Sequence, residues 1–294
     1  IENGQPLGAP ELIRHNMGAS SNLYLARDGR LFQVENKGTT DSFITQVDQQ
    51  TGKPTGTASL LEPNYPNAAW PKWSSDGKLI YYDVHKGASN EDLLFIHLEA
   101  TGQTREITLK PKLKMWYNPV LSPDGRRFAV TGMSENMNWG IFAIDSESGE
   151  VNQLAKINTE NEPVDPSQNW SSDSKAIFFK VRSMEQSEEF IIRRKDLESG
   201  KEKDIYRGFH TRDMEISPDG GQFVYYRNDK PTKSYVLGIL DIQSGKELEL
   251  WRVTDPDEIS DPVWAPDGRH VFVLKNIKQG TELWRFPSTG GPGE

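Results

Sequence analysis

The stretch "WSSDGKLIYYD" occupies residues 73–83, and closely similar text returns along the whole chain. The copies are "LSPDGRRFAVT" (121–131), "WSSDSKAIFFK" (170–180), "ISPDGGQFVYY" (216–226), "WAPDGRHVFVL" (264–274) and a weaker "LARDGRLFQVE" (25–35). Each begins with a tight-turn signal: Pro presets φ, the Asp carboxylate accepts backbone N–H groups and Gly tolerates positive φ. An aromatic and β-branched run follows, which is typical of a strand. The motif therefore predicts a turn between two strands, with a structural role for each Asp.

The turn motif recurs at a nearly constant interval. Its aspartates are spaced by 46–49 residues, at Asp28, Asp76, Asp124, Asp173, Asp219 and Asp267. A second glycine turn recurs in the same register, at Gly52, Gly102, Gly149, Gly200, Gly245 and Gly290. Periods of about 40–50 residues are typical of propellers and solenoids.

Each repeat holds four strand-like segments and no amphipathic helix of useful length. The segment before the Asp turn and the aromatic run after it are followed by a second apolar run, then by a shorter polar segment suited to an exposed edge. We therefore predict an all-β, six-bladed β-propeller of four-stranded antiparallel blades, formed by residues 1–294 as one domain. The large residue that opens each motif is predicted to be core: Trp73, Leu121, Trp170, Ile216 and Trp264.

The two chain ends complement each other. The sixth repeat stops at "LWRFPSTGGPGE" without a fourth segment, whereas "GAPELIRHN" near the start has no repeat of its own. We expect residues 1–16 to be the outer strand of blade six, closing the ring and removing free sheet edges.

Composition excludes several functions. The chain of 294 residues has no cysteine, so disulfides, thiolate catalysis and cysteine-ligated metals are excluded. Its net charge is -9 and no Lys/Arg tract is present, which argues against a nucleic-acid partner. No apolar run is long enough to insert into a membrane. The opening "IENGQPLG" suggests a trimmed product, and we expect a monomer or part of a longer chain.

The motif "W-S-P-D-G-K-x-I-x-Y", with "D-x-x-[ST]-G" turns at this period, resembles the TolB-type, WD40-like (PD40) propeller repeats of bacteria. The resemblance covers essentially the whole chain, although Arg27 and Ser174 depart from the turn pattern. It implies a periplasmic or extracellular location. Propellers of this kind differ in task, as protein-binding modules, sensor domains or non-catalytic domains of larger peptidases.

Candidate binding residues lie three to five positions before the opening residue of each motif, where the inner strands are expected to line the mouth of a central channel. Neighbouring residues stay alike between repeats, but these positions diverge, which suits a recognition surface. The candidate ligand-binding residues are Asn22, Trp70, Trp116, Tyr117, Asn118, Arg212, Asp213 and Asp261, and Asp165 is a further polar residue in this zone. The aromatic rings are the expected anchors, and Arg212 is expected to select a carboxylate. Packing between blades is the alternative for Trp70 and Trp116.

Three functions remain open. Motifs for serine hydrolases, zinc proteases and phosphate-binding loops are absent, and the five histidines share no metal-binding pattern. This favours a non-catalytic module that binds a protein segment, a peptide or a small ligand, without a cofactor. A calcium-dependent hydrolase of the lactonase or esterase type is the first alternative, with the oxygen ligands Asn22, Asn118, Asp213 and Asp261. A non-catalytic propeller domain of a larger protein is the second.

Overall fold

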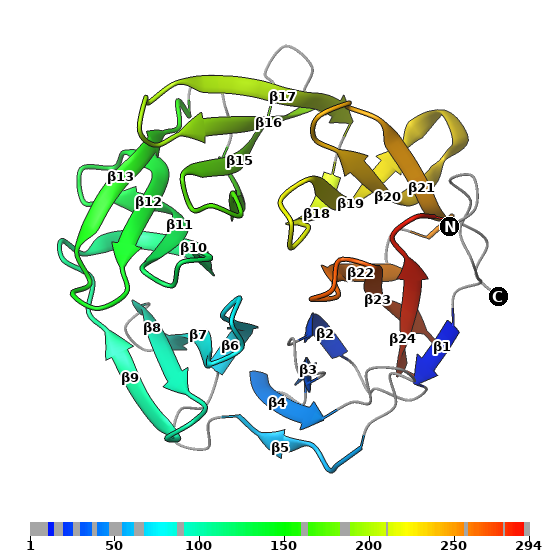
Figure 1. Cartoon of the computed structure of the whole chain (residues 1–294), viewed down its shortest axis with the longest axis horizontal. Helices are drawn as coiled ribbons and strands as arrows, with labels where there is room; N and C mark the ends of the chain where they lie inside the picture. The colour runs from blue at the N-terminus through cyan, green and yellow to red at the C-terminus, as the bar shows by residue number, and fades with distance from the viewer. Residues whose placement is uncertain are drawn as a thin grey trace. The chain divides into compact units, whose positions relative to one another are not determined.

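The structure is a computed structural model of the chain. It describes residues 11–14, 20–25, 30–36, 40–46, 55–61, 68–86, 91–159, 164–182, 189–209, 211–255, 258–278 and 280–290. Strands dominate these residues, and their helical content is the short 3-10 turn η1 (Lys230–Thr232) (Figure 1). The predicted all-β character is confirmed.

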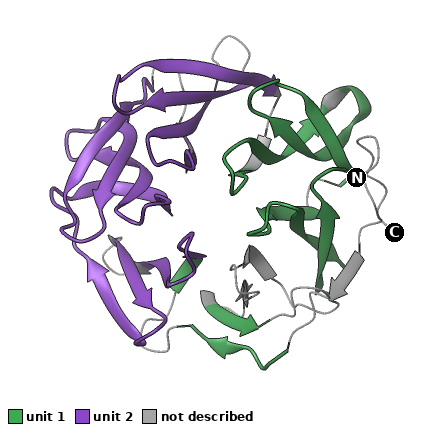
Figure 2. Ribbon diagram, in the orientation of Figure 1, with its two compact units in different colours: residues 1–71, 211–294 green, residues 72–210 purple. Residues whose placement is uncertain are grey.

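The chain divides into two compact units, residues 1–71 with 211–294 and residues 72–210 (Figure 2). The boundary falls within β6 (Ala68–Trp73), the first strand of the sheet β6-β7-β8-β9. All the sheets are four-stranded, as the repeat predicts.

The first unit contains three complete sheets with antiparallel neighbours. Their orders are β1 (Glu11–Arg14), β24 (Gly280–Pro287), β23 (His270–Ile277) and β22 (Ile259–Trp264); then β2 (Ser20–Leu25), β3 (Arg30–Asn36), β4 (Thr40–Gln46) and β5 (Ser59–Leu60); then β18 (Thr211–Ile216), β19 (Gln222–Asp229), β20 (Ser234–Asp241) and β21 (Glu247–Val253).

The second unit repeats the same pattern. Its strands are β7 (Leu79–Lys86), β8 (Glu91–Leu98) and β9 (Gln103–Ile107); then β10 (Leu113–Leu121), β11 (Arg127–Ser134), β12 (Trp139–Asp145) and β13 (Val151–Lys156); then β14 (Val164–Trp170), β15 (Ala176–Arg182), β16 (Glu189–Asp196) and β17 (Glu202–Phe209).

The N-terminal strand joins the last sheet at its outer edge. β1 pairs antiparallel with β24, with Glu11 opposite Arg285 and Leu12 opposite Trp284. Residues 11–14, the described part of the segment predicted as the outer strand, thus form the outer strand of this sheet. Residues 1–10 and 15–16 lie outside the described residues, as does the first turn around Asp28.

The repeated Asp turn has one hydrogen-bonding scheme. In four repeats a serine hydroxyl donates to the Asp two residues later at 2.6 Å, in the pairs Ser74–Asp76, Ser122–Asp124, Ser171–Asp173 and Ser217–Asp219. The same carboxylate accepts a backbone N–H two residues further on, from Lys78, Arg126, Lys175 and Gly221. Because one carboxylate oxygen accepts both hydrogen bonds that hold the turn, the scheme accounts for Asp at this position without a catalytic role.

The residues that open the motif pack between neighbouring sheets. Leu121, Trp170 and Trp264 are buried, as predicted, whereas Trp73 and Ile216 are half-buried. The indole N–H of Trp170 donates to the carbonyl of Val120 at 2.9 Å, and that of Trp264 donates to the carbonyl of Glu215 at 3.2 Å. Val120 and Glu215 each directly precede the residue that opens the motif of the preceding repeat. The same contact therefore occurs in both units.

The turn aspartates make the fold sensitive to acid. The hydroxyls of Ser74, Ser171 and Ser217 are the largest cause of the lowered pKa values of Asp76, Asp173 and Asp219. A carboxyl group whose pKa is lower in the folded chain adds stability above its unfolded value of about 3.9. That stability is lost as the pH falls through the folded pKa.

We expect Asp219→Asn to reduce the loss of unfolding free energy between pH 7 and pH 3, because the amide does not titrate in this range. Ser217→Ala should have a similar effect, since it removes the same hydrogen bond from the other side. Urea unfolding of both variants at the two pH values measures this. An acid sensitivity identical to that of the unchanged chain in both variants would contradict the assignment.

Candidate functional site in the inner strands

The inner strands share a break in pairing near the predicted binding positions. The register between the first and second strand of a sheet shifts at Ser21/Tyr24, Tyr117/Val120, Val164/Gln168, Thr211/Met214 and Ser260/Val263. A bulge of this kind bends the strand and re-aims a side chain. The divergent sequence positions therefore coincide with an irregularity that the fold repeats.

Three residues at one repeat position have left-handed backbone conformations. Trp70, Asn118 and Asp261 have φ of 53°, 52° and 51°, and each lies three residues before its motif. Asn and Asp tolerate this conformation better than other side chains, whereas a bulky residue there is strained. Asn22 and Asp213 occupy the same place in their repeats. The left-handed backbone conformation thus explains the preference for Asn and Asp at these positions, which the sequence analysis considered as calcium ligands.

Trp70 has no such backbone reason. Its side chain is 47% exposed although its φ is unfavourable for a large residue. Strain held at an exposed position is a pointer to function, since neither packing nor turn chemistry accounts for the residue. Trp70 thus keeps its place as a candidate anchor in the first unit.

The neighbours Trp116 and Tyr117 face different surroundings in the second unit. Trp116 is 4% exposed and belongs to a core cluster with Leu94, Ile107 and Phe128. The structure thus corrects its expected place at an open mouth and supports the alternative, packing against the neighbouring sheet. Tyr117 is 43% exposed, as an anchor requires.

Tyr117 heads a group of apolar side chains at one end of the sheet β10-β11-β12-β13. Its ring lies parallel to that of Trp139, with centroids 6.4 Å apart, and its hydroxyl contacts Met115 Sδ at 3.6 Å. Met137, in the β11–β12 turn, is 57% exposed and receives the ammonium group of Lys114 at 3.2 Å. We call Met115, Tyr117, Met137 and Trp139 the β10–β12 patch. Sequence reasoning missed its other three members: Met115 is two residues away on the same strand, and Met137 and Trp139 come near Tyr117 through the β11–β12 hairpin.

Asn118 is tied into a polar network. Its amide oxygen accepts Lys72 Nζ at 2.6 Å, and its carbonyl accepts the buried side-chain amide of Gln168. Thr131 Oγ1 donates to Gln168 Oε1 at 2.7 Å. These bonds fix the bulge of β10 against β14. They also place an ammonium group beside the oxygen that a cation would need.

Asp165 forms an ion pair with Lys180 and does not line an open binding surface. Its carboxylate lies 3.1 Å from Nζ of Lys180, whose side chain is 1% exposed and lies 4.6 Å from the centroid of Phe190. A buried ammonium needs such a partner, so Asp165 has a structural task. Predicting this pair from sequence would have required knowing that Lys180 points inward.

The remaining candidates belong to the first unit. Asp261 lies in β22 and is half-buried. The backbones of Asn22, Arg212 and Asp213 lie in β2 and β18, and their side chains are outside the described residues. Their roles as ligand or metal contacts stay predictions. Among side chains that are described, no three His, Asp or Glu groups gather as a metal site would need.

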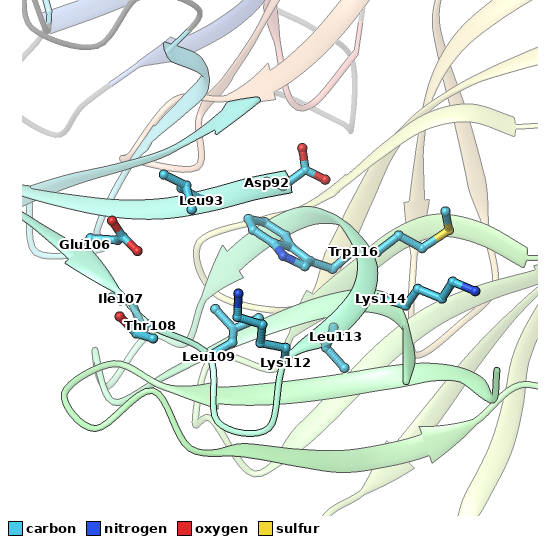
Figure 3. Close-up of a pocket in the computed structure, with 11 residues that line it drawn as sticks. Asp92, Leu93, Glu106, Ile107, Thr108, Leu109, Lys112, Leu113, Lys114 and Trp116 are labelled. Atoms are coloured by element: carbon cyan, nitrogen blue, oxygen red, sulfur yellow. The ribbon is translucent and has the colours of Figure 1, made fainter. Parts of the chain in front are cut away.

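A cavity of about 400 Å³ opens beside β10 in the second unit (Figure 3). Trp116, Ile107, Leu109 and Leu113 are apolar residues of its lining. Charged side chains complete the lining. Asp92 lies on β8 and Glu106 on β9, whereas Lys112 directly precedes β10 and Lys114 lies on it. Figure 3 shows the indole of Trp116 and the side chain of Lys112 at the hollow. The cavity thus joins an apolar floor to a rim of opposite charges.

Comparisons with known proteins agree on the architecture. Residues 31–291 match the family model described as the TolB beta propeller domain. A search of curated proteins found no match. No described helix could span a bilayer.

Several solved structures resemble the chain. TolB from Acinetobacter baumannii superposes with a TM-score of 0.64 at 22% identity, covering 90% of this chain and 65% of the TolB chain. An oligogalacturonate lyase in complex with manganese has a TM-score of 0.63 at 12% identity, with coverages of 96% and 94%. A gluconolactonase from Xanthomonas campestris has a TM-score of 0.60 at 12% identity, with coverages of 95% and 88%. At these identities the likeness concerns the fold, and the chain spans less than two thirds of that TolB.

Proposed function

The chain belongs to the TolB β-propeller domain family, and we propose that it is a non-catalytic binding module that recognises a protein segment. The observation that carries the proposal is the exposed ring of Tyr117, held on a rigid inner strand beside Trp139. Rigid aromatic side chains lose little entropy on binding and bury a large area, so they often dominate interfaces. We further propose that the propeller has six blades closed by the N-terminal strand, and that the protein is periplasmic.

The apolar surroundings of Tyr117 favour a polypeptide over a small polar substrate. Met115 and Met137 are flexible, polarisable side chains that adapt to varied apolar partners. A contiguous patch of exposed apolar side chains typically marks an interaction surface. In the first unit, the strained and exposed Trp70 supports the same use of inner strands.

The hydrolase alternative has weaker support from the described residues. Asn118 and Asp261 adopt the left-handed backbone conformation that favours their residue types. The oxygen of Asn118 is already an acceptor for Lys72. A calcium site at Asn22, Asn118, Asp213 and Asp261 therefore stays an alternative proposal that calcium titration by calorimetry can test.

Site-specific crosslinking tests the binding proposal. With a photoreactive phenylalanine analogue at position 117, we expect one protein from a bacterial periplasmic extract to be crosslinked in preference to others. The same group at Lys201, an exposed turn position in the same unit, is the matched control and should not capture that protein.

Two alanine variants separate binding from folding. Tyr117→Ala should compete poorly for the crosslinked protein while its melting temperature stays near that of the unchanged chain, because the side chain is exposed. Trp116→Ala should instead lower the melting temperature, since it empties part of the core. Equal crosslinking at positions 117 and 201, or a large loss of stability in Tyr117→Ala, would refute the proposal.

A further inference from the structure

The cavity and the β10–β12 patch meet along β10, where Met115 belongs to both. Lys114 lines the cavity, and its ammonium group reaches Met137 Sδ of the patch. The ammonium group of Lys114 therefore lies where the cavity approaches Met137. This is an ordered sequence of apolar, positive and apolar features within the second unit.

The charge along this edge contrasts with that of the whole chain. Lys110, Lys112 and Lys114 are exposed at alternate positions, although the net charge of the chain is -9. An acidic ligand is repelled by most of such a protein and is attracted only where cations gather. The carboxylates of Asp92 and Glu106 lie on the opposite rim of the cavity, on β8 and β9.

This distribution sets the polarity of a ligand. Asp92 and Glu106 disfavour a carboxylate on their side of the cavity, whose floor of Trp116 and Leu113 suits an apolar side chain. A carboxylate is favoured next to Lys114, and a second apolar side chain is favoured on Tyr117 and Met137. In an extended peptide, alternate side chains face the same way and successive ones on that face are about 7 Å apart.

We propose that the cavity and the β10–β12 patch together bind an extended segment of a partner protein that carries an acidic side chain between two apolar ones on one face. The proposal rests on the proposed binding function and adds its chemistry and its second anchoring point. One apolar residue enters the cavity above Trp116, and the acidic residue pairs with Lys114. The second apolar residue lies against Tyr117 and Met137.

Fluorescence anisotropy with defined peptides tests this inference. The probe is a labelled, capped peptide with the order Ser, Leu, Ser, Asp, Ser, Phe, Ser, and the comparison peptide has Lys in place of Asp. We expect the acidic peptide to bind at least tenfold more tightly than the comparison peptide. We also expect its binding to weaken between about 50 and 300 mM salt, because Lys114 is exposed.

Variants locate the binding. Lys114→Glu should weaken the acidic peptide at least tenfold, and Met137→Ala should weaken both peptides severalfold, without loss of folding because both side chains are exposed. Lys201→Glu makes the same change in net charge in the same unit and should alter binding less than twofold. Equal affinity for the two peptides, or equal effects of Lys114→Glu and Lys201→Glu, would overturn the inference.

The two proposals fail in different ways. A crosslink specific for position 117 combined with no preference for the acidic peptide refutes the ligand chemistry and leaves the binding function standing. Peptide binding that Tyr117→Ala leaves unchanged removes Tyr117 from the site, and with it the observation on which the binding function rests.

Discussion

Trp170→Ala is expected to lower the free energy of unfolding by about 3–5 kcal/mol, as large-to-small changes in a protein core do. Trp170 is 2% exposed and packs with Ile141, Ile177 and Phe179 in one buried cluster. Its indole also donates a hydrogen bond to the carbonyl of Val120 at 2.9 Å. The substitution removes the largest side chain of this cluster and leaves a carbonyl without its donor.

Trp170→Phe separates these two contributions. Phenylalanine keeps most of the apolar contact but cannot donate to Val120, so the expected loss is about 1–3 kcal/mol, the typical cost of an unsatisfied buried group. Urea unfolding followed by circular dichroism measures both variants. We expect the free energy of unfolding to be lowest for Trp170→Ala, intermediate for Trp170→Phe and highest for the unchanged chain. An Ala variant within about 1 kcal/mol of the unchanged chain would mean that Trp170 is not a core residue.

The architecture could be predicted because its signals are local and repeated. A turn such as Ser122–Pro–Asp124–Gly requires particular residue types at fixed offsets, and its geometry depends on few distant contacts. Repetition at a constant period then made the four-stranded sheets readable. The burial of Trp170 and Trp264 was also predictable, because large apolar residues at the end of an inner strand tend to pack against the neighbouring sheet.

The binding surface was less predictable because it depends on which face a residue takes. Trp116 and Tyr117 are neighbours of similar type, but one is buried and the other exposed. The bulge between Tyr117 and Val120 shifts the register at this point, so alternation alone does not assign the faces. Met137 joins the patch only because the β11–β12 turn brings it to Lys114.

The Asn/Asp pattern has two physical explanations that sequence alone does not separate. Oxygen-bearing side chains suit a hard cation, and the same residues tolerate the left-handed backbone conformation. The φ angles of Asn118 and Asp261 supply the second explanation at two of the four positions. The recurrence of Asn and Asp three residues before each motif was visible in the sequence, but only the φ angles show that the backbone conformation favours these residues.

Equivalent glycines in two repeats should respond very differently to alanine. Gly149 and Gly200 end the same "SG" turn and have φ of 74° and 68°, a conformation that costs an L-residue about 1–2 kcal/mol. At Gly200 no described atom lies within 4 Å of an added methyl group, so Gly200→Ala should lose about that amount. At Gly149 the methyl group would overlap the carbonyl oxygen of Thr108 and lie 2.9 Å from its carbon.

This crowding has a structural origin in the second unit. The segment between β9 and β10 lies directly on the turn, with Lys110 N donating to Gly149 O and Val151 N donating to Lys110 O, both at 2.8 Å. A methyl group at 149 has to displace this segment and weaken both hydrogen bonds, each worth about 0.5–1.5 kcal/mol. Gly149→Ala should therefore cost roughly 3–4 kcal/mol, about twice the loss in Gly200→Ala or more.

Because Thr108, Leu109 and Lys112 also line the cavity, the same displacement should reach the proposed ligand. Gly149→Ala is expected to weaken the acidic peptide at temperatures where the variant is still folded, whereas Gly200→Ala should bind it as the unchanged chain does. Unfolding curves and peptide anisotropy on the two variants, measured side by side, give both quantities. Equal losses of stability would show that the segment yields easily. Unchanged peptide binding in a folded Gly149→Ala variant would place the ligand away from the cavity.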